Sequence, residues 1–167
     1  MRSSSVDALN DDIAEYMNQL SKGQIQKAYR GIMSFMSGLR TFLEERHPDC
    51  TAGSLYSGYM DMTYFAFTPS GLRSYKLKIA IVYLHEKGSF EAWLCGSNRK
   101  IQAEYVDFFS RRDTGEYRPS QVTPGGDSII EVTLSERPDF DSPEDLKREI
   151  EKKVLKFAED IASLLRV

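Results

Sequence analysis

The chain has 167 residues, of which 41% are hydrophobic and 28% charged, a composition typical of one globular domain with a substantial core. Its net charge of −3 gives no electrostatic drive toward nucleic acid or an anionic membrane, so we expect neither as a partner. No segment reaches the roughly 20 apolar residues that span a bilayer, the N-terminus lacks the apolar region of a signal peptide, and we therefore expect a cytoplasmic protein.

Two amphipathic helices are predicted at the start of the chain, after a disordered stretch at residues 1–5. Apolar residues recur at three- and four-residue spacing across residues 6–20 and again across residues 25–43. Gly23 can end the first helix. The second helix is expected to end before His47, because the residue that precedes a proline is pushed out of the α region.

Three β-strands in an antiparallel meander are predicted next. They cover residues 59–68, 75–86 and 90–96. The first is rich in aromatic and β-preferring side chains, and the segments TPSGLRS and EKGS are typical of the turns between the strands. The first strand is largely apolar on both parities, which is typical of an interior strand that is buried on both faces.

The register of the second hairpin decides whether Asp61 and Glu91 share a face of the sheet. If residues 85–89 form its loop, Glu91 lies beside Tyr83, because directly opposed antiparallel residues share a face. Asp61 joins that face only if it pairs with an odd-numbered residue, and a slip of one residue sends it to the face of Lys78. We expect the two acids to lie on different faces.

A third helix, a long loop, a fourth strand and a final helix complete the predicted order. Asn98 is the expected N-cap of the third helix, and residues 110–127 lack periodicity, which predicts a loop that is either mobile or functional. Residues 128–136 form the fourth strand, and Ser142 caps the last helix.

The predicted fold class is therefore α+β, as a single domain over residues 1–167 with the element order ααβββαβα. We expect a mixed sheet of about four strands, an antiparallel meander plus one strand after a crossover helix, flanked by helices.

The motifs of most cofactor-dependent enzymes are missing from the sequence. It has no phosphate-binding loop, no dinucleotide-binding glycine motif, no zinc-ligand spacing and no nucleophile elbow. Cys50 and Cys95 are too few for a disulfide framework. We therefore expect no cofactor and no metal ion, and the pattern favours a protein that is not an enzyme.

Tyrosine and tryptophan side chains provide the candidate ligand-binding residues, because each combines an apolar body with a polar tip. The candidates are Tyr56, Tyr59, Tyr83 and Trp93. The simpler interpretation is that these side chains pack the two faces of the sheet between helices.

The element order resembles the core of the PD-(D/E)XK nuclease fold, in which carboxylates hold a divalent metal that activates water. This resemblance implies a metal-dependent hydrolase with Asp61, Glu91 and either Glu44 or Glu45 as its acids and Lys78 as a charge partner. Trp93 stands where that family places its lysine, so such a site would be degraded.

A second resemblance covers most of the chain, about residues 12–110. It rests on the segments GQIQKAYRGIMSFMSGLRTFL, LYSGYMDMTYFAFTP and LKIAIVYLHEKGSFEAWLCGSNRKIQAEY. Together they resemble an uncharacterised family of small bacterial proteins classed as a domain of unknown function. The resemblance implies a bacterial, cytosolic source, and it assigns no activity and no catalytic residue.

These observations favour a protein that binds a small molecule or a protein partner through the tyrosine-rich sheet face or the loop at residues 110–127. Two alternatives stay open. One is the degraded nuclease-like hydrolase, and the other is a homodimeric structural or interaction protein that associates through a helix face.

Overall fold

The computed structural model describes residues 5–120 and 128–166. By packing, the chain divides into two compact units, residues 1–35 and residues 36–167. The disorder expected for residues 1–5 falls mostly outside the described residues, although Ser5 already begins a helix. Of the loop predicted at residues 110–127, the last seven positions also lie outside them.

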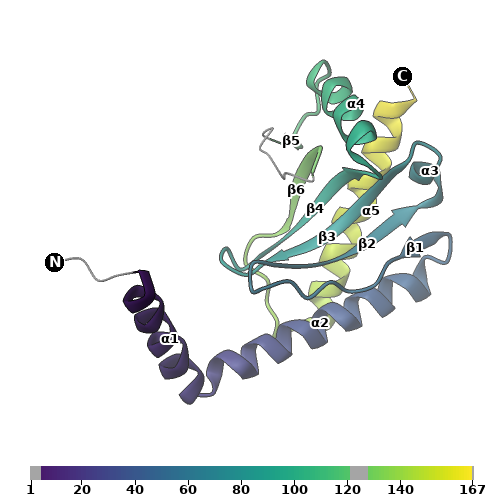
Figure 1. The fold of residues 1–167 in the computed structure, drawn as a ribbon. Coiled ribbons are helices and arrows are strands. Elements are labelled where there is room, and N and C mark those ends of the chain that lie inside the picture. Colours follow the sequence, from purple (N-terminus) through teal and green to yellow (C-terminus); the bar gives the residue numbers. More distant parts are fainter. Residues whose placement is uncertain (1–4, 121–127, 167) are drawn as a thin grey trace. The chain divides into compact units, whose positions relative to one another are not determined.

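The first unit consists of two helices joined by a tight turn. They are α1 (Ser5–Ser21) and the first half of α2 (Gln24–Arg46) (Figure 1). Gly23 has a φ of +81°, in the left-handed region that glycine favours, and its N–H donates to the Leu20 carbonyl at 3.0 Å. This geometry ends α1 and confirms the break predicted at Gly23.

The second unit is built on a six-stranded sheet in the order β1-β2-β3-β4-β6-β5, and every pair of neighbours is antiparallel. The strands are β1 (Cys50–Ala52), β2 (Met62–Pro69), β3 (Leu77–Leu84), β4 (Ser89–Gly96), β5 (Arg118–Pro119) and β6 (Ile130–Ser135). The α+β class and the meander are confirmed. The sheet is antiparallel where a mixed one was expected, and it gains β1 and β5, which are too short to leave a periodic pattern in the sequence.

Three further helices belong to the second unit. They are α3 (Ser70–Arg73), α4 (Arg99–Ser110) and α5 (Pro143–Leu165). α3 occupies a segment that the sequence predicts as a turn. The Asn98 Oδ1 accepts a hydrogen bond from the Ile101 N–H at 2.9 Å, which confirms the N-cap of α4. The side chain of Ser142 makes no such bond, although the helix after it begins as predicted.

Within the second unit, the described helices cover one face of the sheet, and the opposite face is left open except at the end where α4 meets it. The covered face carries alternate residues of β3 and β4, including Ile79, Ile81, Ala92 and Leu94, which are fully buried. α5 lies against this face, as Figure 1 shows, and contributes Ile150, Val154, Phe157 and Ile161 to the core. The main hydrophobic core therefore lies on one side of the sheet.

The register of the β3–β4 hairpin differs by one residue from the loop considered from the sequence. Leu84 pairs with Ser89, so the turn spans residues 85–88, and Val82 pairs with Glu91. Because alternate residues point to opposite faces, this shift moves Glu91 away from Tyr83 and onto the open face. The placement of Glu91 beside Tyr83 is thus wrong.

A buried carboxylate ties the end of α2 to α5 within the second unit. The Glu151 Oε2 accepts a hydrogen bond from the Arg46 Nε at 2.7 Å and lies 2.8 Å from the His47 Nε2. Burial alone would raise the pKa of Glu151, but the hydrogen bonds from Arg46 and His47 outweigh it and hold the pKa below its usual value.

The lowered pKa of Glu151 predicts a pH-dependent stability. The stabilisation is complete above the unfolded-state pKa of about 4.3 and is lost as the pH falls through the lower folded-state value. Glu151→Gln should lower the free energy of unfolding by about 1–2 kcal/mol near neutral pH, because it removes charge-assisted hydrogen bonds. Urea unfolding should also show a weaker decline of stability toward acid in this variant than in the wild type.

Glu149→Gln provides the matched control on α5, because Glu149 is exposed and pairs with Lys153 at 3.5 Å. This change should have little effect on stability. Equal acid sensitivity of the wild type and Glu151→Gln would contradict the assigned role of Glu151.

Candidate functional site

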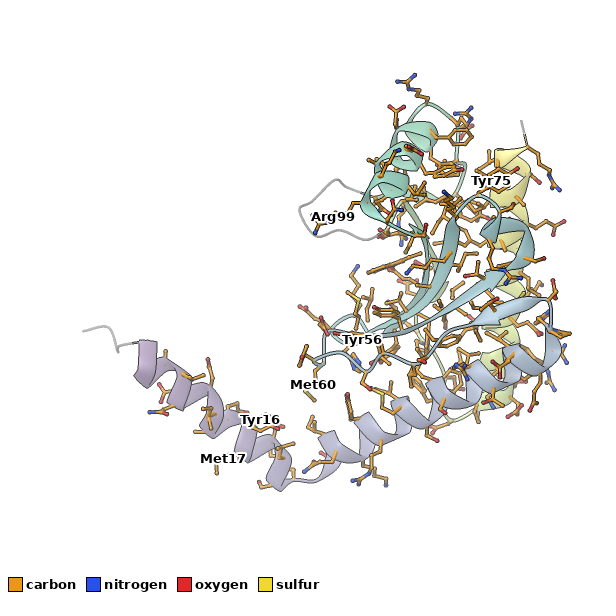
Figure 2. The ribbon with its side chains drawn as sticks, turned by 45° about the vertical axis from the view of Figure 1, so that its right-hand side comes forward. Tyr16, Met17, Tyr56, Met60, Tyr75 and Arg99 are labelled. Carbon is orange, nitrogen blue, oxygen red and sulfur yellow. The ribbon has the colours of Figure 1, made fainter. Side chains whose placement is uncertain are left out.

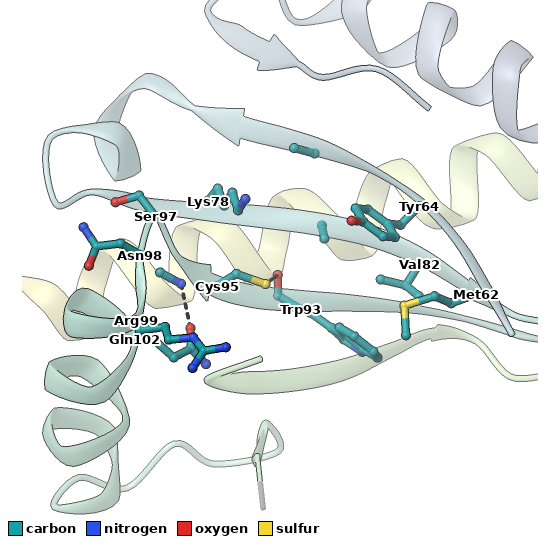
Figure 3. A pocket seen from close by; sticks show the side chains of 13 residues that line it. Met62, Tyr64, Lys78, Val82, Trp93, Cys95, Ser97, Asn98, Arg99 and Gln102 are labelled. Carbon is teal, nitrogen blue, oxygen red and sulfur yellow. Dashed lines mark hydrogen bonds between the residues drawn. The ribbon is translucent and has the colours of Figure 1, made fainter. Parts of the chain in front are cut away.

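The open face of the sheet carries a pocket of about 440 Å³ (Figure 3). Its floor consists of the buried side chains of Ala80, Val82 and Cys95. Partly buried apolar side chains stand around this floor, among them Met62 and Trp93. The volume lies within the range of about 300–1,000 Å³ that small-molecule sites occupy.

Strand pairing explains why this face is hollow. Ala80 of β3 pairs with Ala66 of β2 on one side and with Trp93 of β4 on the other. Directly paired residues share a face, so two alanines lie next to each other in the middle of the sheet. Larger neighbours, including Tyr64 of β2, rise around these small side chains and form the walls.

The end of the pocket near α4 is polar and positively charged. Lys78 of β3 and Arg99 of α4 line it, together with Ser97 and Asn98 from the connecting turn (Figure 3). None of the described residues that line the pocket is acidic. The pocket thus combines an apolar floor with two cationic side chains at one end.

A close backbone approach at Gly96 brings α4 to the pocket. The Gly96 N–H donates to the Gln102 Oε1 at 2.9 Å. A Cβ atom at Gly96 would lie only 2.6 Å from the backbone nitrogen of Gln102. Glycine is therefore required where β4 passes into α4, because any side chain would push the helix away.

A buried carboxylate beside the pocket orients the indole of Trp93. The Glu91 Oε1 accepts a hydrogen bond from the Trp93 Nε1 at 2.9 Å, and its Oε2 lies 3.4 Å from the Arg118 guanidinium. Arg118 comes from β5 and also donates to the Thr133 hydroxyl of β6 at 3.1 Å. The carboxylate thus holds the Trp93 ring, which forms part of the pocket wall.

The family described as a domain of unknown function, DUF7000, matches residues 9–165. The chain belongs to this family. The resemblance to an uncharacterised family is thereby confirmed. No curated protein and no solved structure matches the chain.

None of the described helices of this DUF7000 chain combines the length and the apolar character that crossing a bilayer requires.

The acids proposed for a hydrolase lie apart in the DUF7000 chain. Glu44 is exposed on α2 and lies 3.5 Å from Arg40. Asp61 is exposed before β2, where its Oδ1 accepts the Tyr59 N–H at 2.9 Å, and such backbone hydrogen bonds hold its pKa below the usual value. Glu91 is buried on the open sheet face. Within residues 5–120 and 128–166, no three His, Cys, Asp or Glu side chains are placed to hold a metal ion.

The four candidate aromatic residues are not brought together either. Trp93 lines the pocket. Tyr83 is buried on the covered face, and Tyr59 is 90% exposed. Tyr56 lies beside a pocket residue, since its ring centroid is 4.9 Å from that of Tyr64. Lys78, which the sequence suggested as a charge partner for an acid, lines the cationic end.

The backbone contact at Gly96 predicts a clear difference between two glycines. Gly96→Ala should lower the free energy of unfolding by about 1–3 kcal/mol, because the new Cβ overlaps the backbone of α4. At Gly71 a Cβ would meet nothing within 4 Å, so Gly71→Ala should cost nothing. Urea unfolding measures both, and equal losses would refute the close approach.

Proposed function

We propose that this DUF7000 domain binds a small organic molecule with an apolar, planar body and an anionic group. This proposal rests on the change along the pocket from an apolar floor to a positively charged end. The floor at Ala80 and Val82 offers an apolar surface, while Lys78 and Arg99 supply positive charge at the other end. Apolar contact provides most of the affinity in such sites, and a few placed polar groups fix the orientation.

The Trp93 wall supports a planar ligand body. Its indole is held at one edge by the Glu91 carboxylate, so the ring keeps its orientation before a ligand arrives. A preorganised aromatic surface lowers the entropy cost of binding and favours ring-to-ring contact. Trp93 is the one tryptophan of the chain, so its fluorescence reports directly on the pocket.

Filling the floor should weaken the binding of an anionic aromatic probe. We predict that 8-anilinonaphthalene-1-sulfonate binds with one saturable site and quenches Trp93 fluorescence. Ala80→Phe should weaken this binding about tenfold or more, a change of about 1.4 kcal/mol. Ala103→Phe is the control, because Ala103 is exposed on α4 and does not line the pocket. Unchanged binding by Ala80→Phe would place the probe elsewhere and refute the site.

The cationic end should select for charge. Lys78→Gln and Arg99→Gln should each lower the affinity for the anionic probe about three- to tenfold. The affinity for the uncharged N-phenyl-1-naphthylamine, which has the same aromatic body, should not change. Lys100→Gln is the control on a neighbouring exposed residue of α4. Parallel losses for both probes would contradict a role for these charges and indicate a change in pocket shape instead.

A cytoplasmic location also stays a proposal. It is supported by Cys50 and Cys95, which are both free thiols, as is usual in a reducing compartment. Burial raises the pKa of the Cys50 thiol to about 11, so this side chain stays protonated and unreactive near neutral pH.

A further inference from the structure

The strand register sets the distance between the apolar wall of the pocket and its cationic end. Val82, Ala80 and Lys78 are successive residues of β3 on the open face, because alternate residues of a strand point to the same side. Trp93 pairs with Ala80, and Cys95 pairs with Lys78. Two residues of an antiparallel strand rise about 7 Å, so the level of the indole and the level of the lysine are about 7 Å apart along the strand.

The cationic end is suited to an anion that carries more than one charge. Lys78 and Arg99 both line it, with the hydroxyl group of Ser97 as a further hydrogen-bond donor. Among the described residues, neither cationic side chain takes part in an ion pair. Figure 2 shows Arg99 at the start of α4 and, apart from it, Tyr56, whose ring lies against that of Tyr64. Two positive charges therefore stay available to a ligand at this end.

The exposure of the cationic end favours a phosphate group there. Lys78, Ser97 and Arg99 are exposed, whereas Ala80 and Cys95 on the floor are buried. Burying a charged group away from water is unfavourable, so the anionic group fits the exposed end and the apolar body fits the floor. A carboxylate carries one negative charge, whereas a phosphate ester carries about −1.5 to −2 near neutral pH. The phosphate is thus the better match for two cations.

We propose that the pocket binds an aromatic ring joined to a phosphate group by a spacer, with the ring centre and the phosphate about 7 Å apart. This inference rests on the proposed function and names the class of its ligand. The ring lies over Ala80 against Trp93, and the spacer crosses Cys95. The phosphate group contacts Lys78 and Arg99. Nucleoside monophosphates and phosphate esters of aryl-alkyl alcohols share this chemistry.

A titration followed by nitrogen-15 NMR tests the inference on the intact chain. Trp93 is the one tryptophan, so its indole N–H gives a unique signal whose shift reports a ligand at the pocket wall. The two long phosphates are 3-phenylpropyl phosphate and adenosine monophosphate. At least one of them should bind about tenfold or more tightly than phenyl phosphate, whose spacer is too short, and than 4-phenylbutyrate, which has a similar length but a single negative charge. The tighter of the two identifies the source of the phosphate.

Variants of the cationic end separate the contribution of the phosphate from that of the ring. Lys78→Gln combined with Arg99→Gln should remove most of the advantage of the long phosphate over 4-phenylbutyrate. The affinity for 3-phenylpropanol, which has the same ring and no charge, should not change. Lys100→Gln is the control, because Lys100 is exposed on α4 and does not line the pocket.

The outcomes distinguish this inference from the proposed function. Equal affinities for the long phosphates, phenyl phosphate and 4-phenylbutyrate would overturn the spacer and the phosphate but leave a pocket for anionic aromatic molecules. The same holds if no phosphate shifts the Trp93 signal while 8-anilinonaphthalene-1-sulfonate does. If none of these compounds shifts it, the proposed function is wrong as well.

Discussion

The pairing of Val82 with Glu91 in the β3–β4 hairpin determines which side chains of the two central strands face the helices. With this register, Tyr83 and Phe90 pack into the covered core, while Glu91 and Trp93 face the open side. A slip of one residue would exchange the two sets, because the side-chain period of a strand is two. The core, the pocket floor and the orientation of the indole all depend on this one alignment.

Local signals made most of the elements predictable from the sequence. The apolar spacing of α1, α2 and α5 and the Asn98 cap are properties of neighbouring residues, and the structure places these helices where they were expected. The register was not predictable, because Ala80 and Val82 make the second parity of β3 apolar next to the hairpin, and Lys78 marks the solvent side only at the far end of the strand. Near the turn no polar side chain distinguishes the two faces, so a four-residue and a five-residue turn fit the sequence equally well.

The pocket was harder to predict than the fold because it arises between elements. Trp93 and Lys78 were recognised by residue type, but their shared cavity depends on Ala66 and Ala80 meeting across two strands. The local sign of the pocket in the sequence is Gly96, shortly before the Asn98 cap. Because Gly96 has no side chain, α4 can lie close to the end of β4. The aromatic stretch around Asp61 has the residue types of an acid site, but the Asp61 carboxylate accepts a backbone hydrogen bond in a turn.

The buried Glu91 is best understood through the ring that it holds. Burying a carboxylate is unfavourable unless its oxygens find partners, and a buried ion pair adds little stability over apolar packing. Here one oxygen fixes the Trp93 indole and the other faces Arg118, which the two-residue strand β5 carries to this position. An apolar residue at position 91 would pack against the sheet but leave the indole free to turn into the hollow above Ala80. The carboxylate therefore contributes to the shape of the pocket, and β5 supplies the charge that allows it to be buried there.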